Sequence, residues 1–221
     1  MHKRTFIFLM VAACDPYGPD KGGDNGKGAF RYECVASTDP TCQGSLVEQS
    51  FPKEIALGSV FAASFDGTTL SAATSTTGTV LQSASTAVLH FESGQFRATS
   101  AGYGGLLALN SAGRVVDFTH VLIAPATAYA ILRDSLTPAL AVMKVGASQT
   151  VYASPLDGNG ITIAGAVPAT WAVSDPTVLE LVEGSPAVTM PINAKAVGSA
   201  TLTVTAAALT RTLTITVEAA Q

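Results

Sequence analysis

Charged side chains are scarce along this chain. They make up 13% of its 221 residues, where an ordinary soluble domain has about a quarter, and the formal net charge is −4. Proteins that bind nucleic acid neutralise phosphates with clustered lysines and arginines, and the sequence contains no such cluster. We therefore expect no nucleic-acid partner. Alanine, serine, threonine and glycine take the place of the missing charges.

Residues suited to catalysis are also few. His2, His90 and His120 are the only histidines, and the last two lie in strand-like runs. Asp117, His120 and one of the many serines could be written as a catalytic triad, but no G-x-S-x-G elbow, H-E-x-x-H motif or phosphate-binding loop accompanies them. The sequence therefore predicts a protein that is not an enzyme and has no catalytic residues and no cofactor.

A long hydrophobic run is missing as well. A helix that spans a membrane needs about 20 apolar residues, and the apolar run near the amino terminus covers only residues 5–13. His2, Lys3 and Arg4 form a positive head before this run, and two small residues, Ala12 and Ala13, end it. A charged head, a short apolar centre and small residues at the end are typical of an export signal. We predict a signal peptide over residues 1–13.

Val11, Ala12 and Ala13 stand directly before Cys14. An aliphatic residue and two small residues ahead of a cysteine resemble the lipobox of bacterial lipoproteins. The resemblance implies that the signal is cut before Cys14, that the Cys14 thiol carries diacylglycerol and that the new amino terminus is acylated. The lipid would then hold the chain on a membrane. An ordinary signal peptide followed by a chance cysteine is the alternative.

The location follows from the signal and from Asp15. We expect the bacterial cell envelope, and we favour the outer membrane or the cell surface. In enteric bacteria an aspartate directly after the acylated cysteine tends to keep a lipoprotein in the inner membrane, whereas other lineages do not follow this rule. Because Asp15 occupies that position, the inner membrane stays open as an alternative.

Cys34 and Cys42 are the two remaining cysteines. An exported protein meets oxidising conditions, so a disulfide that closes a small loop is the expected use of the pair, with two free thiols as the alternative. Structural zinc needs four ligands and no histidine lies nearby, so we expect no metal site. Residues 15–30 hold five glycines and two prolines, and we assign residues 14–50 to a flexible linker that carries the disulfide loop.

From residue 51 onward the hydrophobic period is two. In residues 200–206 and 212–217, apolar residues alternate with threonines, which predicts half-buried strands and a terminal hairpin. Residues 79–89 match 169–179, and residues 96–102 match 192–198, so that Leu81 stands opposite Trp171. This repeat predicts two domains, 51–126 and 127–221.

The second copy contains GASQTVYASPLDGNG, ATWAVSDPTVLEL and AKAVGSATLTVTA. These segments resemble the group 2 bacterial immunoglobulin-like domain, which occurs in tandem on bacterial surface proteins and adhesins. The resemblance implies an all-β fold of two tandem immunoglobulin-like β-sandwiches. We expect Trp171 in the core, with a ligand-stacking role as the alternative, and Gly198 at a close backbone approach. The first copy has Leu81 at the tryptophan position and rests on the internal match.

The expected function is a lipoprotein that displays non-catalytic domains for binding or adhesion to a protein or glycan partner. A structural spacer, or a subunit of a larger envelope assembly, is the alternative. Tyr103 lies between glycines at an expected turn and is the one ligand-binding candidate; its alternative role is packing against the neighbouring domain.

The lipid anchor can be tested on the mature protein. Mass spectrometry should find Cys14 at the amino terminus, with a mass increase equal to a diacylglyceryl group and an added acyl chain. Changing Cys14 to Ser should abolish both the cleavage before residue 14 and the added mass. A mature chain that carries no lipid would contradict the anchor.

Overall fold

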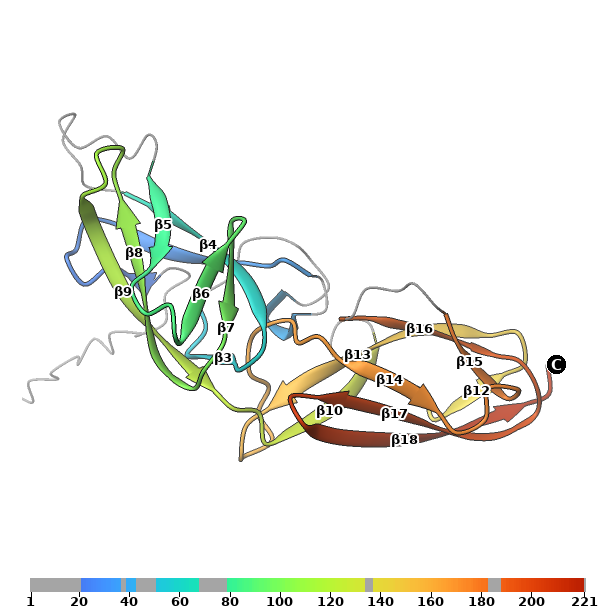
Figure 1. Ribbon diagram of the computed structural model, residues 1–221. Coiled ribbons are helices and arrows are strands. Elements are labelled where there is room, and N and C mark those ends of the chain that lie inside the picture. The colour runs from blue at the N-terminus through green and yellow to red at the C-terminus, as the bar shows by residue number, and fades with distance from the viewer. Residues whose placement is uncertain are drawn as a thin grey trace, which may run out of the picture.

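The chain folds into two β-sandwiches joined end to end (Figure 1). The computed structural model describes residues 21–36, 39–42, 51–67, 79–133, 137–182 and 188–220. Within these ranges almost all regular structure is strand, and the single helix is the 3-10 turn η1 (Pro40–Cys42). The described residues include no helix long and apolar enough to cross a membrane. The predicted signal peptide, Cys14 and Asp15 lie outside them.

The first sandwich consists of a five-stranded and a four-stranded sheet. In spatial order the five strands are β1 (Lys21–Gly22), β2 (Ala29–Glu33), β4 (Val60–Asp66), β7 (Gln95–Ala98) and β6 (Leu89–Glu92). The four strands are β3 (Glu54–Ala56), β9 (Val115–Ala124), β8 (Gly102–Leu109) and β5 (Val80–Ser83). All pairings are antiparallel except the parallel pair of β3 with β9.

The second sandwich repeats this arrangement. Its five strands are β11 (Thr137–Pro138), β10 (Ala128–Arg133), β13 (Ser148–Leu156), β16 (Met190–Ala194) and β15 (Leu179–Leu181). Its four strands are β12 (Val142–Lys144), β18 (Leu209–Glu218), β17 (Gly198–Ala206) and β14 (Thr170–Val173). The parallel pair again joins the first and the last strand of the four-stranded sheet in chain order, here β12 and β18. This strand order is that of an immunoglobulin-like sandwich, so the predicted all-β fold is confirmed.

The internal repeat extends to single hydrogen bonds. The amide of Leu89 donates to the Ser85 carbonyl at 2.8 Å, and the amide of Leu179 donates to the Asp175 carbonyl at 3.1 Å. Gly58 and Gly146 are the third residues of matched turns, with φ of 85° and 84°, a left-handed conformation that favours glycine. The two copies are therefore the same structural unit built from different residues.

The linker prediction is wrong for residues 21–33. These residues form β1 and β2, and β2 pairs with β4 inside the five-stranded sheet. Phe30 and Tyr32 of β2 are fully buried, and the Tyr32 ring stacks on Phe61 at a centroid distance of 5.3 Å. Two aromatic side chains at strand spacing bury enough apolar surface to order this glycine-rich segment. The first sandwich thus begins at residue 21 rather than 51. The predicted boundary at residue 126 lies between the end of β9 and the start of β10.

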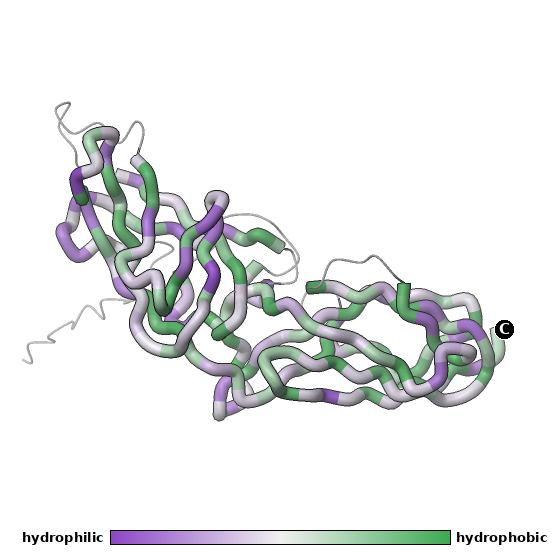
Figure 2. Tube along the Cα trace, in the orientation of Figure 1, coloured by the Kyte–Doolittle hydropathy of each residue, from purple (hydrophilic) through white to green (hydrophobic). Residues whose placement is uncertain are grey.

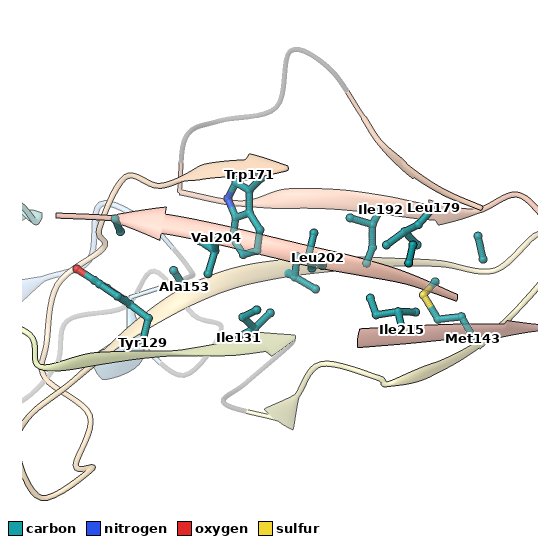
Figure 3. Packing of buried hydrophobic residues seen from close by; sticks show 14 of the residues in the cluster. Tyr129, Ile131, Met143, Ala153, Trp171, Leu179, Ile192, Leu202, Val204 and Ile215 are labelled. Atoms are coloured by element: carbon teal, nitrogen blue, oxygen red, sulfur yellow. The ribbon is translucent and has the colours of Figure 1, made fainter. Parts of the chain in front are cut away.

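Trp171 lies in the core of the second sandwich, where Figure 3 shows its ring over Val204 of β17. The side chain is 8% exposed, and Leu81 at the matched position of the first sandwich is also 8% exposed. The ligand-stacking alternative for Trp171 is therefore wrong. A Cβ atom at Gly198 would lie 2.8 Å from a methyl carbon of Val178, as expected for a close approach. Green and paler segments alternate along the strands of this domain, following their two faces (Figure 2).

The role of β2 can be tested by truncation. A chain of residues 51–221 should lose the folded first sandwich, because burial of Phe30 and Tyr32 contributes about 1.5–3 kcal/mol each. A chain of residues 15–221 retains both strands and serves as the reference. Denaturation followed by hydrogen exchange reports both domains, while fluorescence of Trp171, the only tryptophan, reports the second one. Equal protection of β4 and β7 in both chains would contradict the assignment.

Candidate functional site

The loop between β1 and β2 is held in place by a buried carboxylate. Asp117 on β9 is fully buried and accepts hydrogen bonds from the amides of Asn25 (2.8 Å) and Lys27 (2.7 Å) in the loop between β1 and β2. The loop approaches so closely that a Cβ atom at Gly23 would lie 2.2 Å from the Asp117 carboxyl carbon. Glycine is therefore required there, and the glycine-rich stretch wraps an anion of its own chain.

His120 and Asp117 do not form a triad. Asp117 faces the interior of the sandwich, whereas His120, three residues further along the same strand, faces solvent. The His120 Nδ1 atom lies 3.1 Å from the Asp24 carboxylate in an exposed pair. His90 is exposed as well and lies 3.9 Å from Glu92. The sequence could not place Asp24 beside His120, because 96 residues separate them.

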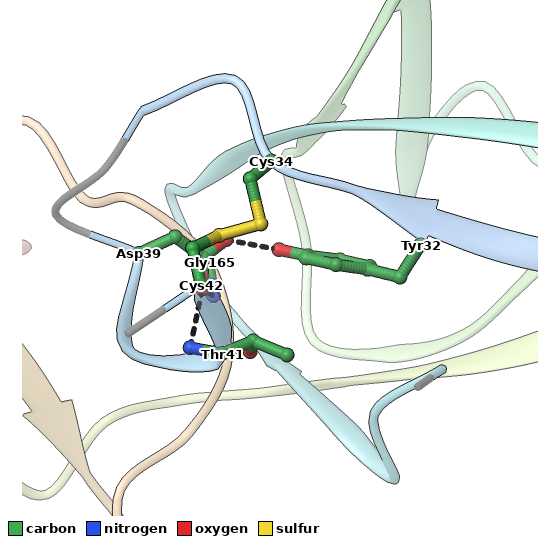
Figure 4. Close-up of a disulfide and its surroundings, with 6 residues drawn as sticks. All are labelled: Tyr32, Cys34, Asp39, Thr41, Cys42 and Gly165. Carbon is green, nitrogen blue, oxygen red and sulfur yellow. Dashed lines mark hydrogen bonds between the residues drawn. A yellow bond between two sulfur atoms is a disulfide. The ribbon is translucent and has the colours of Figure 1, made fainter. Parts of the chain in front are cut away.

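Cys34 and Cys42 form a disulfide in the structure, with their Cα atoms 6.0 Å apart (Figure 4). Asp39 lies within the loop that it closes and is only 1% exposed. Although one ligand atom from each of these three residues lies within 4.8 Å of the others, both sulfur atoms are used by the disulfide, so the group does not offer a metal site. Its chemistry is that of a buried carboxylate surrounded by donors.

Asp39 joins three parts of the chain. Its Oδ1 atom accepts from the Thr41 amide at 2.9 Å and from the Gly165 amide of the second domain at 3.0 Å. Its Oδ2 atom accepts a hydrogen bond from the Tyr32 hydroxyl (Figure 4). Burial, together with the nearby Asp39 charge and this hydrogen bond, raises the pKa of Tyr32, so the hydroxyl keeps its proton and donates.

The two domains also exchange backbone hydrogen bonds along this seam. The amide of Ala56 donates to the Ala164 carbonyl at 2.8 Å, and the amide of Val60 donates to the Ala166 carbonyl at 3.1 Å. Ala164 packs in the core of the first domain, while Ala56 packs in the core of the second. The seam is therefore a continuous packed junction between two sandwiches.

Gly165 lies at a close approach of the two domains in the seam. A Cβ atom there would fall 2.3 Å from the Ser59 hydroxyl, and the residue has φ of 108°. A cleft of about 370 Å³ opens beside it, with Lys53 and Asp157 among its lining residues. Hydrogen bonds from backbone amides, chiefly that of Ile161, lower the pKa of Asp157 and engage its carboxylate in a turn. The Asp157 carboxylate thus serves the turn.

A different surface carries the candidate for binding. The outward side chains of β5, β8 and β9 form a face of the first sandwich, which we call the apolar face. No Asp, Glu, Lys or Arg belongs to it on these three strands, although Glu54 of β3 pairs with Leu122 at one edge and the Asp24 carboxylate lies against His120. Its members are Val80, Gln82, Tyr103, Leu107, Phe118, His120 and Leu122. Val80 is 51% exposed, and the aliphatic residues and Phe118 in the middle of the sheet are half-buried.

Tyr103 belongs to this face. The sequence places it at a turn, but it is the second residue of β8 and pairs with Leu122. Its side chain is 69% exposed, so it does not pack against the second domain. Phe118 makes an edge-on ring contact with His120 at a centroid distance of 5.8 Å. The face thus presents three rings and several aliphatic side chains to solvent.

The second sandwich has the same face with different chemistry. Where β8 and β9 pair Leu107 with Phe118, β17 and β18 pair Thr203 with Thr212. The pair Tyr103–Leu122 corresponds in the same way to Ser199–Thr216. Threonine side chains are polar and favour the β-strand as well as branched apolar side chains do. The fold therefore does not require apolar residues at these positions. The apolar face is a property of the first domain and not of the repeat.

Comparisons with known proteins give a general likeness. No protein-family model and no curated protein matches the chain. The S-layer protein SbsC, domains 4 and 5, is similar at 17% identity and a TM-score of 0.32, over 68% of this chain and 82% of that one. The Escherichia coli adhesin FdeC is similar at 15% and 0.33, over 77% and 62%. A β-glycosidase from Bacteroides vulgatus is similar at 17% and 0.31, over 57% and 19%. Likenesses this distant carry no argument about function.

Asp39 can be tested by substitution. Asp39→Ala removes the acceptor of two buried donors, the Tyr32 hydroxyl and the Gly165 amide, and should lower the free energy of unfolding by about 2–4 kcal/mol. Asp39→Asn keeps an Oδ1 acceptor for Gly165 and should lose less. Chemical denaturation measures both, and equal stability of the Ala variant and the wild type would contradict the role assigned to Asp39.

Proposed function

We propose that the chain is a non-catalytic binding protein of the bacterial cell envelope, anchored by lipid at Cys14 and displaying two immunoglobulin-like domains. The observation that carries the proposal is the apolar face. Soluble proteins seldom leave rings and aliphatic side chains together on one sheet face unless that face meets a partner. The matched threonines of the second domain support this reading, since they satisfy the same fold without exposing apolar surface.

The anchor and the fold together define how the domains would be presented. Between Cys14 and β1 lie so few residues that this segment, even fully extended, could reach only about 25 Å. The first sandwich would therefore stay near the lipid, and the apolar face would be displayed close to the membrane. In Figure 1 the carboxyl terminus lies at the end of the second domain away from the first, which makes that end the outer tip.

A structural role is the second candidate, either as a spacer or as a subunit of an envelope assembly. The seam favours it, because hydrogen bonds of Asp39 with Gly165 and of Ala56 with Ala164 hold the two domains in one orientation. A stiff pair of domains keeps a fixed distance between its ends. A spacer needs this stiffness but has no need of the apolar face.

Binding to cells separates the two candidates. Labelled chain 15–221 should bind intact bacterial cells, and the triple variant Leu107→Thr, Phe118→Thr and Leu122→Thr should bind at least 10-fold less. Protease treatment of the cells should abolish binding if the partner is a protein, and periodate should abolish it if the partner is a glycan. A matched variant with Thr203→Ser, Thr212→Ser and Thr216→Ser controls for the number of changes. Equal binding by all three chains, or none by any, would favour the spacer.

A further inference from the structure

The second domain docks on the first by adding a strand to it. Ala164 bridges β3 in the parallel sense, and Ala166 bridges the start of β4 in the antiparallel sense. The amide of Ala56 donates to the Ala164 carbonyl at 2.8 Å, and the amide of Ala164 donates to the Glu54 carbonyl at 3.3 Å. Residues 162–166 therefore pair with the outer side of β3, which is an edge strand of its own sheet.

The second domain carries a copy of this docking edge at its end away from the first domain (Figure 1). We call residues 142–148, which include β12 and the turn after it, the distal edge. The turns after β3 and β12 make matching hydrogen bonds. Leu57 and Val145 donate to the last residues of β9 and β18 at 2.8 and 2.9 Å, and Gly58 and Gly146 donate to the last residues of β7 and β16 at 2.9 and 2.8 Å. The backbone that receives the docked strand is thus present twice.

In the second domain the outer side of this edge faces solvent. Alternate residues of a strand direct their N–H and C=O groups to opposite sides, so those of Val142 and Lys144 point away from β18. β12 is an edge strand, and within the described ranges no bridge reaches its outer side. Val142, Lys144 and Ser148 are exposed, whereas Ala56 in the seam is fully buried. The distal edge therefore offers the backbone groups that the seam uses in the first domain.

The turn of the distal edge requires a small residue in its partner. In the seam, a Cβ atom at Gly165 would fall 2.5 Å from the Cβ atom of Ser59. Ala147 takes the place of Ser59 at the distal edge and keeps this Cβ atom. A strand that docks there in the same way needs glycine at the matching position.

Charge makes the distal edge weaker than the seam. Lys144 stands where the seam has Ala56, and Glu218 is its partner in the register of β12 with β18. The edge thus carries one charge of each sign, and an uncharged strand meets no net charge there. A lysine on an edge strand disfavours strand addition but leaves the backbone hydrogen-bonding groups in place. Docking at this edge is therefore reversible, unlike the seam.

The docked strand of the seam belongs to the connection between β13 and β14, at the end of the second sandwich that faces the first. A second copy of this chain does not offer residues 162–166, because they are engaged in its own seam. We propose that the distal edge binds the corresponding connection of a further immunoglobulin-like domain on a partner protein. This connection adds a parallel strand of small, uncharged residues to β12. The distal edge lies on the second domain and is independent of the apolar face.

A synthetic peptide of residues 159–169, NGITIAGAVPA, tests the distal edge. At about 5 mM it should shift the amide NMR signals of Lys144 and Ser148 in the chain 15–221 and slow their hydrogen exchange roughly 3-fold or more. The same peptide with Gly165→Val should bind about 10-fold more weakly, because its side chain meets the turn. Equal binding of the two peptides, or no shift over residues 142–148, would overturn the proposal.

Two variants at one position isolate the backbone donor. Lys144→Pro removes the outward amide and leaves the ladder with β18 intact, because an edge strand tolerates proline where its N–H faces solvent; it should weaken peptide binding about 10-fold. Lys144→Ala keeps the amide, installs the residue of the first domain and should strengthen binding about 3-fold. Fluorescence of Trp171 and thermal unfolding verify that the second domain stays folded. Unchanged binding by the Lys144→Pro chain would contradict strand addition.

The apolar face serves as the control surface. The variant Leu107→Thr, Phe118→Thr and Leu122→Thr should bind the peptide as tightly as the wild type, because the distal edge belongs to the other domain. Peptide binding that is lost in this variant would place the peptide on the apolar face and reject the distal edge. Peptide binding that persists in a chain that binds no cells supports the distal edge, although the adhesion role would then be lost.

Discussion

The buried carboxylate of Asp39 is the interaction on which the arrangement of the chain depends. A carboxylate out of contact with water is costly unless donors surround it, and here donors come from its own loop, from β2 and from the second domain. The buried donors in turn depend on the Asp39 carboxylate. The Tyr32 hydroxyl and the Gly165 amide are buried groups that need an acceptor, so the disulfide loop, β2 and the seam are positioned together.

Asp117 satisfies the same requirement at another place. It receives backbone amides from a loop 90 to 92 residues earlier in the chain. Asp117 holds the loop between β1 and β2 through main-chain donors, while Asp39 ties the disulfide loop to β2 through the Tyr32 hydroxyl and to the second domain through the Gly165 amide. Stability of the first sandwich therefore depends on residues whose polar and glycine-rich composition is typical of linkers.

The sequence was informative where structure is local. Alternating apolar residues predicted the strands, and the match of Leu81 with Trp171 predicted two copies of one unit, since period and turn residues are local properties. It failed for β2, because Phe30 and Tyr32 follow a glycine-rich stretch and their burial depends on β4. The contacts of Asp39 with Gly165 and of Asp117 with Asn25 join segments 126 and 92 residues apart, which no local pattern encodes. The apolar face was missed for a similar reason: GYGGLLAL does not alternate, and only the pairing register shows that Leu107 points outward.

The seam also bears on how such a chain can change over time. In an array of independent domains, recombination can shuffle, duplicate or delete one domain at a time. Here Ala164 of the second domain packs in the core of the first, and Ala56 of the first packs in the core of the second. The Gly165 amide of the second domain also donates to Asp39 in the disulfide loop of the first. Removing either domain would leave a cavity in the core of the domain that stays. The two domains are consequently expected to be gained, lost or exchanged together, as one unit.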